Sequence, residues 1–310
     1  MKRIFSGLLF GFVRLCAFLP LPVLFFFSDI FLYPIVYYVV RYRLKVVRKN
    51  LKNSFPEKTR KELHQIERKF YRHFCDTFQE TIRILGMSPE EAKKRMVFKN
   101  PEMVTDFSKQ QQGVLIVLGH YGNWEYQPFL FLYMLESGNQ VGYSIFRPLK
   151  NEAFDQLYIR IRTRFQGGVA TKSQAYRKLI NLRHEGKAAV FGLVCDQTPS
   201  AANLHYWTPF LNQDTSILIG PERMAKQTGF AVVYADVEKT GRGRYRTTYE
   251  LITDKPQETE TFEITEKYAR LMEKTILREP AYWLWTHKRW KHKHQLETVH
   301  KAKDFKIEAS

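Results

Sequence analysis

The hexapeptide HYGNWE at residues 120–125 places a histidine and a glutamate five positions apart, directly after the apolar run GVLIVLG. A carboxylate that accepts from one imidazole nitrogen fixes the tautomer and leaves the other nitrogen free to take a proton from a hydroxyl. Positions i and i+5 of a continuous helix point about 140° apart. His120 and Glu125 can therefore meet only if the histidine precedes a helix and the glutamate lies in its first turn. The spacing alone leaves a catalytic pair and two structural polar residues equally open.

Other chemistries fit this stretch less well. A zinc site of the HExxH kind needs a second histidine one helical turn away, and HYGNWE has none. The sequence GHYG is also not a G-x-S-x-G nucleophile elbow, and no serine or cysteine lies beside the histidine. A base without a protein nucleophile indicates direct attack by a substrate hydroxyl or a water, and the start of a helix beside it suits an anion. Asn123 is a candidate cap for that helix, and we expect no metal and no cofactor.

Short apolar runs alternate with amphipathic stretches through the body of the chain. We expect strands at 113–119, 141–146, 188–195, 230–237 and 244–252, and helices at 58–86, 122–136, 151–165, 173–185, 216–228 and 262–278. Nearly all-apolar strands separated by helices of this length predict an α/β fold with a mostly parallel central sheet, covered by helices on both faces. Active sites in such sheets lie at the carboxyl ends of the strands. His120 follows a strand, so it stands at such an end.

The first forty residues predict a membrane anchor. Between Ile4 and Val40 the only charged residues are Arg14 and Asp29. About 20 apolar residues suffice to cross a bilayer, whereas a signal peptide has a shorter apolar region. Proline interruptions leave open whether the segment makes one span or a span plus an interfacial helix. A buried helix of a soluble protein is the alternative.

Charge and cysteine content narrow the class of partner and compartment. Lys+Arg 49 against Asp+Glu 31 gives a net charge of +18, which favours an anionic partner. The basic residues that follow position 40 are typical of the cytoplasmic side of an anchor and of contact with anionic headgroups. Three widely separated cysteines suit a reducing compartment. We expect three regions: an anchor at 1–40, a basic juxtamembrane and helical segment at 41–100, and an α/β domain at 101–310.

Several motifs, taken together, resemble a known family. GHYGNWE resembles the H-x4-D/E motif of the lysophospholipid acyltransferase superfamily, and more closely the HFGNWE of the late acyltransferases of lipid A biosynthesis. Further blocks follow in that family's order: FRPLKN at 146–151, CDQ at 195–197, TPFLNQDT at 208–215 and WLWTHKRWK at 283–291. The chain departs from the family where Cys195 replaces a proline, in NQDT and in HKRW. These departures leave the acceptor and the acyl chain length open.

The resemblance implies acyl transfer from a thioester, usually acyl carrier protein, to a hydroxyl of a glucosamine-based lipid A precursor, without an acyl-enzyme. His120 would be the general base and Glu125 its orienting partner. Residues in the similar blocks are implied to bind substrate: Asn123, Arg147, Arg164, Asp196 and Gln197. The two arginines would meet phosphates or a developing oxyanion, although Arg164 is equally well explained as a solvated charge. For Asp196, the strand end favours a functional role.

The implied location is the inner membrane, with the anchor holding a cytoplasmic catalytic domain, and the implied partners are the carrier protein, the lipid acceptor and the membrane. Three rival interpretations stay open. One is an enzyme of the same superfamily that acts on another glycolipid, a glycerolipid or an aminolipid. Another is an inactive scaffold that keeps the fold. The third is a membrane-tethered nucleic-acid binder, but we expect no nucleic acid because no recognisable binding motif accompanies the charge.

Overall fold

A computed structural model describes residues 11, 13–136 and 141–295. Its centre is a seven-stranded sheet in the order β1-β9-β8-β2-β5-β3-β4. The strands are β1 Met96–Phe98, β2 Val114–Leu118, β3 Val141–Phe146, β4 Gly168–Thr171, β5 Ala189–Val194, β8 Ala231–Gly241 and β9 Arg244–Thr253. All neighbours pair in parallel except β8 and β9, which form an antiparallel hairpin. The prediction of a mostly parallel sheet is confirmed.

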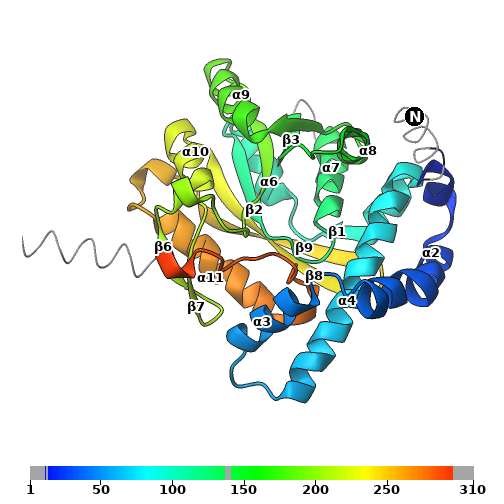
Figure 1. Ribbon diagram of the computed structural model, residues 1–310. Helices are drawn as coiled ribbons and strands as arrows, with labels where there is room; N and C mark the ends of the chain where they lie inside the picture. The colour runs from blue at the N-terminus through cyan, green and yellow to red at the C-terminus, as the bar shows by residue number, and fades with distance from the viewer. Residues whose placement is uncertain (1–10, 12, 137–140, 296–310) are drawn as a thin grey trace, which may run out of the picture.

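Helices flank the sheet on both sides (Figure 1). They are α2 Leu21–Phe27, α3 Leu44–Ser54, α4 Arg60–Arg83, α5 Pro89–Arg95, α6 Glu102–Lys109, α7 Leu130–Glu136, α8 Glu152–Arg162, α9 Lys172–His184, α10 Gly220–Thr228 and α11 Glu263–Arg278. Strand β2 lies near the middle of the sheet and is buried along its whole length. This explains why VLIVL is uniformly apolar, since both of its faces are covered.

Two expected helices differ from the observed ones. The expected helix 122–136 is a 3-10 helix, Trp124–Phe129, followed by α7. Pro128 lies inside this segment and cannot donate a backbone hydrogen bond, which disfavours a regular α-helix here. The expected helix 216–228 begins only at Gly220, because residues 207–216 form a separate hairpin of β6 Trp207–Phe210 and β7 Gln213–Ser216.

The N-terminal apolar segment packs against the body along one side only. Among the described residues, one helical stretch, Leu21–Val39, is long and apolar enough to cross a membrane. Leu21, Leu24 and Phe25 are buried, and α2 lies beside α4 (Figure 1). Large apolar side chains on the other side are exposed: Phe18, Phe26, Phe27, Ile30, Phe31, Ile35, Tyr38, Val39 and Val40. Residues 1–10 and 12 of the expected anchor lie outside the described residues.

Two polar contacts fix this segment to the body. The Arg242 guanidinium on the β8–β9 turn donates to both Asp29 and Asp76, with nitrogen–oxygen distances of 2.7 to 2.9 Å. The Tyr37 hydroxyl donates to the buried Glu67 carboxylate at 2.6 Å. The stretch Leu21–Val39 is therefore built into the fold through both buried apolar packing and contacts to the buried Glu67 and, through Arg242, Asp76.

Candidate active site

The register of two parallel strands brings His120 and Asp196 together. Leu118 of β2 pairs with Val194 of β5, so the residues two positions further along each strand leave the sheet at the same edge. The His120 Nδ1 atom lies 2.6 Å from Asp196 Oδ1, and the His120 backbone N–H donates to Asp196 Oδ2 at 2.8 Å. The carboxyl ends of β2 and β5, where the sequence predicts an active site, therefore carry a contact between a carboxylate and an imidazole.

Asp196 is buried and accepts from three donors. Beside the two His120 groups, the Trp283 indole N–H donates to Oδ2 at 2.7 Å. Burial alone would raise the pKa of the Asp196 carboxyl, but the His120 imidazole and these hydrogen bonds lower it to about 2. The carboxylate is therefore ionised at neutral pH and favours the His120 tautomer that carries its proton on Nδ1.

The other imidazole nitrogen faces Gln197, and the imidazole ring packs against Trp124. Gln197 Nε2 lies 3.2 Å from His120 Nε2, and the His120 and Trp124 rings meet edge to face with centroids 4.9 Å apart. With the proton on Nδ1, Nε2 carries a lone pair and accepts from the Gln197 amide. Gln197 and Trp124 both line a cavity of about 430 Å³. His120 thus has a basic nitrogen directly behind the wall of that cavity.

Glu125 does not contact the His120 ring through the expected hydrogen bond. Its carboxylate instead forms a two-pronged ion pair with Arg162, at 2.8 Å from Nε to Oε2 and 2.6 Å from Nη2 to Oε1. The expectation that Glu125 orients His120 is corrected, because Asp196 occupies Nδ1 and the 3-10 helix turns Glu125 toward α8. Burial opposes the charge of Arg162, but the adjacent Glu125 carboxylate outweighs it and raises the arginine pKa.

Sequence reasoning missed Arg162. It ends α8 within the stretch IRIRTRF, whereas the resemblance implies Arg164 of that stretch by its position in a similar block. Helical spacing does not distinguish the two arginines, because Arg162 points about 140° away from the buried Leu157. What separates them is that Arg162 is the last residue of α8, whereas Arg164 lies beyond the helix end.

Asn123 lies in the interior, with both ends of its side chain engaged. Its Oδ1 accepts from the Glu125 backbone N–H at 3.1 Å, which confirms the expected cap, and its Nδ2 donates to the buried Glu80 carboxylate at 3.0 Å. Tyr245 donates to the same Glu80 oxygen at 2.8 Å. Gly122, just before the cap, has φ +60, a turn conformation that glycine adopts readily. These contacts make Asn123 part of the support for Glu125 rather than part of the cavity wall.

Within the described residues, neither of the two arginines that we expected to bind substrate has a hydrogen bond to His120. Arg164 is exposed and donates to the backbone carbonyls of Leu85 and Met87, at 3.4 and 3.3 Å. These contacts give it the role of holding the end of α8 to the segment after α4. Arg147 is exposed in the loop after β3. The structure brings His120, Asp196 and Gln197 into direct contact. Glu125 and Arg162 form a separate pair, and Glu125 lines the same cavity as Gln197.

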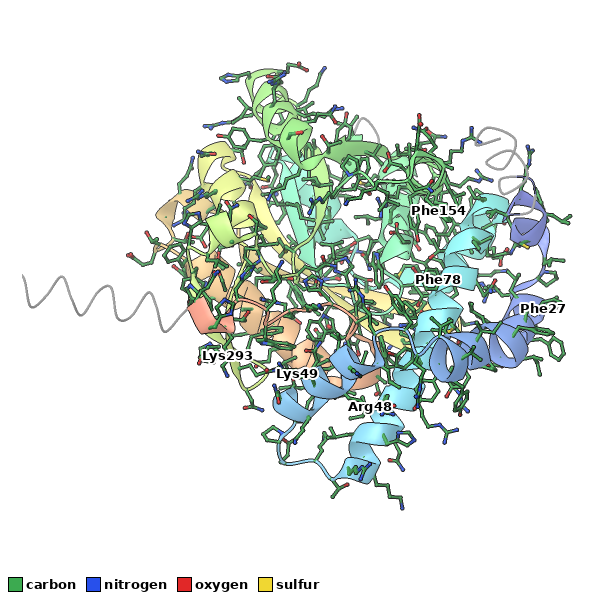
Figure 2. The ribbon with its side chains drawn as sticks, in the orientation of Figure 1. Phe27, Arg48, Lys49, Phe78, Phe154 and Lys293 are labelled. Atoms are coloured by element: carbon green, nitrogen blue, oxygen red, sulfur yellow. The ribbon has the colours of Figure 1, made fainter. Side chains whose placement is uncertain are left out.

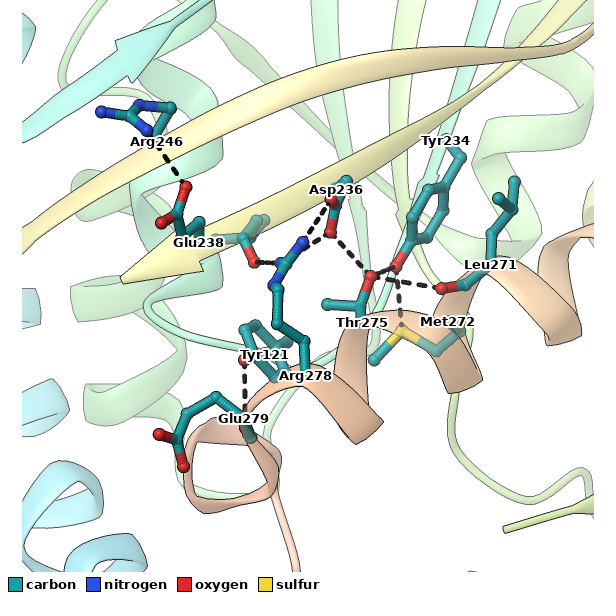
Figure 3. A network of polar contacts seen from close by, with 11 residues as sticks. Tyr121, Tyr234, Asp236, Glu238, Arg246, Leu271, Met272, Thr275, Arg278 and Glu279 are labelled. Carbon is teal, nitrogen blue, oxygen red and sulfur yellow. Dashed lines mark hydrogen bonds and ion pairs between the residues drawn. The ribbon is translucent and has the colours of Figure 1, made fainter. Parts of the chain in front are cut away.

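A C-terminal segment holds His120 in place from the other side. Leu284 N–H donates to the His120 carbonyl at 3.1 Å, Gly122 N–H donates to the Tyr282 carbonyl at 2.9 Å, and Tyr121 forms a β-bridge with Trp283. The Tyr121 hydroxyl donates to the Glu279 carbonyl at 3.0 Å, at the end of α11 (Figure 3). The WLWTHKRWK block therefore supplies the walls around the histidine.

Figure 3 also shows how α11 is attached to the sheet. Arg278 makes a two-pronged ion pair with Asp236 of β8, at 2.7 and 2.9 Å, and Thr275 donates to the same carboxylate at 2.7 Å. Because these contacts fix the end of α11, they also fix the start of the segment that pairs with residues 120–122.

His287 is a second imidazole at the cavity. Its Nε2 accepts from the Thr198 backbone N–H at 3.3 Å, and its ring lines the same cavity as Glu125 and Gln197. Burial and the neighbouring positive charges lower the pKa of His287 to about 4, so the ring is neutral at pH 7. Its position within WTHKRW had not marked it as a site residue.

The cavity wall is mixed in character. Apolar and aromatic side chains line much of it: Tyr42, Phe74, Phe78, Trp124, Leu149, Tyr158 and Leu284. The polar side chains Glu125, Gln197 and His287 also line it, and Gln197 lies beside His120. Phe78 and Leu149 are also exposed to solvent, so the apolar lining continues to the surface. Among the described residues, no group of three or more His, Cys, Asp or Glu side chains is placed to hold a metal ion.

Comparison with known proteins assigns the chain to a family. No curated protein matches this sequence significantly. The family model described as bacterial lipid A biosynthesis acyltransferase matches residues 2–292, nearly the whole chain. This match agrees with the five motif blocks. The chain belongs to the bacterial lipid A biosynthesis acyltransferase family.

Proposed function

We propose that the protein transfers a fatty acyl group from an acyl thioester, with acyl carrier protein as the donor, to a hydroxyl of a lipid A precursor. The observation that carries this proposal is the His120–Asp196 pair directly behind Gln197 and Trp124, which line a cavity with many apolar side chains. The pair supplies a base, and the cavity offers space for an acyl chain. Family membership supports the acyl transfer and the lipid acceptor.

In the proposed reaction, His120 acts as the general base and Asp196 orients it. The acceptor hydroxyl takes the place of the Gln197 amide at Nε2, and its oxygen attacks the thioester carbonyl as Nε2 takes the proton. The tetrahedral intermediate then collapses, the carbon–sulfur bond breaks, and the thiolate receives the proton from the imidazolium. The Asp196 carboxylate stabilises that imidazolium throughout, which is the role a buried, ionised carboxylate serves beside a histidine base.

We assign the Glu125–Arg162 pair to the anionic groups of the reaction. Glu125 lines the cavity and holds the guanidinium beside it. A guanidinium fixed in this way is suited to a developing oxyanion or to a substrate phosphate. Glu125 therefore acts on catalysis through Arg162, which departs from the expectation of direct contact with His120.

We further propose that the enzyme lies at the inner membrane with its catalytic body on the cytoplasmic side. The exposed apolar face of residues 18–40 supports contact with the lipid interior. The basic residues that follow support contact with anionic headgroups. Phe78 and Leu149 at the cavity mouth would let a lipid acceptor enter without full exposure to water.

The test is acyl transfer with defined substrates. Membranes containing the wild-type protein are incubated with labelled acyl carrier protein thioester and a tetra-acylated lipid A precursor, and the lipid products are identified by mass spectrometry. The expected product is the precursor with one more acyl ester, and it is absent when His120→Ala replaces the wild type. If wild-type membranes produce no acylated lipid A precursor but acylate another lipid, the acceptor assignment is wrong.

A further inference from the structure

A basic groove opens beside the C-terminal end of α3. It encloses a volume of about 1400 Å³ between α3, the loop at residues 55–59, the first turns of α4 and the turn between β6 and β7. Its cationic side chains are Arg48, Lys52, Lys58, Arg60, Lys61 and Lys293. The only carboxylate among its lining residues is Glu67.

Most of this charge is not neutralised. Glu67 pairs with Arg48 at 2.8 Å, and Lys58 lies 3.7 Å from the exposed Glu57. Within residues 11, 13–136 and 141–295, no ion pair involves Lys52, Arg60, Lys61 or Lys293. These four cations share a concave surface and repel one another, so an anionic partner in the groove would be favoured. In Figure 2, Arg48 and Lys293 lie on the lower side of the molecule, away from Phe27.

The groove and the catalytic cavity share supporting elements. Arg43, just before α3, lines the cavity and donates to the Thr286 carbonyl at 3.0 Å. Asn50 of α3 donates to the carbonyls of Trp285 and His287, both at 2.9 Å. The far end of α3 holds the groove wall, because the Asn212 amide donates to the Ser54 carbonyl at 3.0 Å. One helix therefore connects the groove to the segment that surrounds His120.

The shape of the groove favours a protein over a membrane. A bilayer surface is flat and contacts protruding cations, whereas this surface is concave and admits a helix or a loop. The exposed apolar face, which suits a bilayer, is formed by residues 18–40 and not by the lining of this groove. Charge complementarity then selects an acidic protein surface.

We propose that this groove docks the acidic protein that delivers the acyl thioester. The inference rests on the proposed function for the identity of that protein, acyl carrier protein. Docking beside α3 places the delivered thioester near the cavity that α3 and the C-terminal segment support. Electrostatic attraction in the groove would raise the association rate and lower the KM for the carrier-bound donor, without changing the chemistry at His120.

The test compares two charge-reversal pairs of equal size. The groove pair is Lys52→Glu with Lys61→Glu, and the control pair is Lys172→Glu with Arg177→Glu, on α9 at the far side of the molecule (Figure 1). Each enzyme is assayed with acyl carrier protein thioester and with acyl-pantetheine, which is too small to need the groove. Binding of fluorescently labelled carrier protein is measured separately by anisotropy, and binding to vesicles with anionic lipid by sedimentation.

The groove pair is expected to raise the KM for the carrier-bound donor at least tenfold and to weaken carrier binding equally. The values with acyl-pantetheine and those of the control pair should stay within twofold of wild type. Unchanged carrier binding by the groove pair would overturn the proposal, as would an equal loss with both donors. If the groove pair loses vesicle binding but keeps carrier binding, the groove contacts the membrane and the proposal is wrong. If the wild type transfers nothing from either donor, the proposed function fails, while the anisotropy result still decides the docking.

Discussion

The Nδ1 atom of His120 lies 2.6 Å from Oδ1 of Asp196, although 75 residues separate the two in sequence and Glu125 is only five positions away. The pairing follows from the parallel register of β2 and β5, which places the two strand ends side by side. In this arrangement the strand-end carboxylate contacts the imidazole, and the carboxylate of the HYGNWE motif holds an arginine.

The Asp196→Asn variant should lose transfer activity by about 10³-fold, a loss typical of an impaired general base. Asparagine keeps the shape of the side chain but cannot stabilise the imidazolium that forms during attack. The measurement is kcat at saturating donor and acceptor. Asp254→Asn, at an exposed position that contributes only a carbonyl contact, is the matched control and should keep wild-type activity. Equal activity of Asp196→Asn and wild type would refute the orienting role.

The Glu125→Gln and Arg162→Met variants should each destabilise the protein by about 3 kcal/mol, because each leaves one partner of a largely buried ion pair without its counter-charge. The double variant should cost less than the sum of the two, since neither charge is then left alone. Urea unfolding of the four proteins measures this coupling. Additive losses would show that the two residues do not act as a pair.

The Trp283→Phe variant should raise the pKa of Asp196 from about 2 toward its ordinary value, because one donor to the carboxylate is removed. A carboxyl with a lowered folded-state pKa stabilises the fold above its unfolded-state pKa of about 4, and that contribution is lost as pH falls toward 2. Acid unfolding of the variant should therefore begin at higher pH than that of the wild type. A midpoint that does not move would contradict the assigned hydrogen bond.

His287 should make the stability of the wild type depend on pH between about 6.5 and 4. Its folded-state pKa of about 4 lies below its ordinary value of 6.5. As pH falls through this window, the unfolded chain binds a proton that the folded chain does not, so the free energy of unfolding decreases. His287→Gln keeps an acceptor for Thr198 N–H and should flatten this part of the curve. The comparison uses urea midpoints at pH 7, 5.5 and 4.5, and parallel curves for the two proteins would exclude His287 as the cause.

Substituting Phe26, Phe27 and Phe31 by serine should release much of the protein from membranes without unfolding it. All three rings are exposed, at 59%, 43% and 53%, so their loss removes apolar surface available to lipid and little of the core. A fall in vesicle partitioning of at least about tenfold is expected from three large apolar side chains. Deleting residues 1–40 is a poorer test, because the buried Glu67 would lose its hydrogen bond from Tyr37 and Arg242 would lose its ion pair with Asp29. Unchanged partitioning of the triple variant would contradict the anchor.

Local sequence patterns predicted five of the seven strands of the sheet, all but β1 and β4, and most of the helices, because each depends on residues close in the chain. The run VLIVL indicates a strand covered on both sides, and the four-residue recurrence of Phe70, Phe74 and Phe78 indicates a helix. The hairpin of β6 and β7 was missed, since its turn uses Leu211 and Asn212 with positive φ, at 50° and 59°, and lacks a glycine signal.

The composition of the site was less predictable than its location. A strand end followed by a turn marked His120 and Asp196 separately, but their contact depends on which strands are neighbours, and the spacing of the motif suggested Glu125 instead. Arg162 and Arg164 differ by two positions in a run of similar residues. Only the end of α8 decides that the first meets Glu125 and the second meets backbone carbonyls.

The most direct test of the central claim is single-turnover acyl transfer by purified wild-type protein and by His120→Ala, with saturating thioester and lipid A precursor. If His120 is the general base, the variant should lose at least about 10²-fold in rate, while thermal unfolding shows it to be folded. A folded His120→Ala protein that transfers at a rate within tenfold of wild type would contradict the claim.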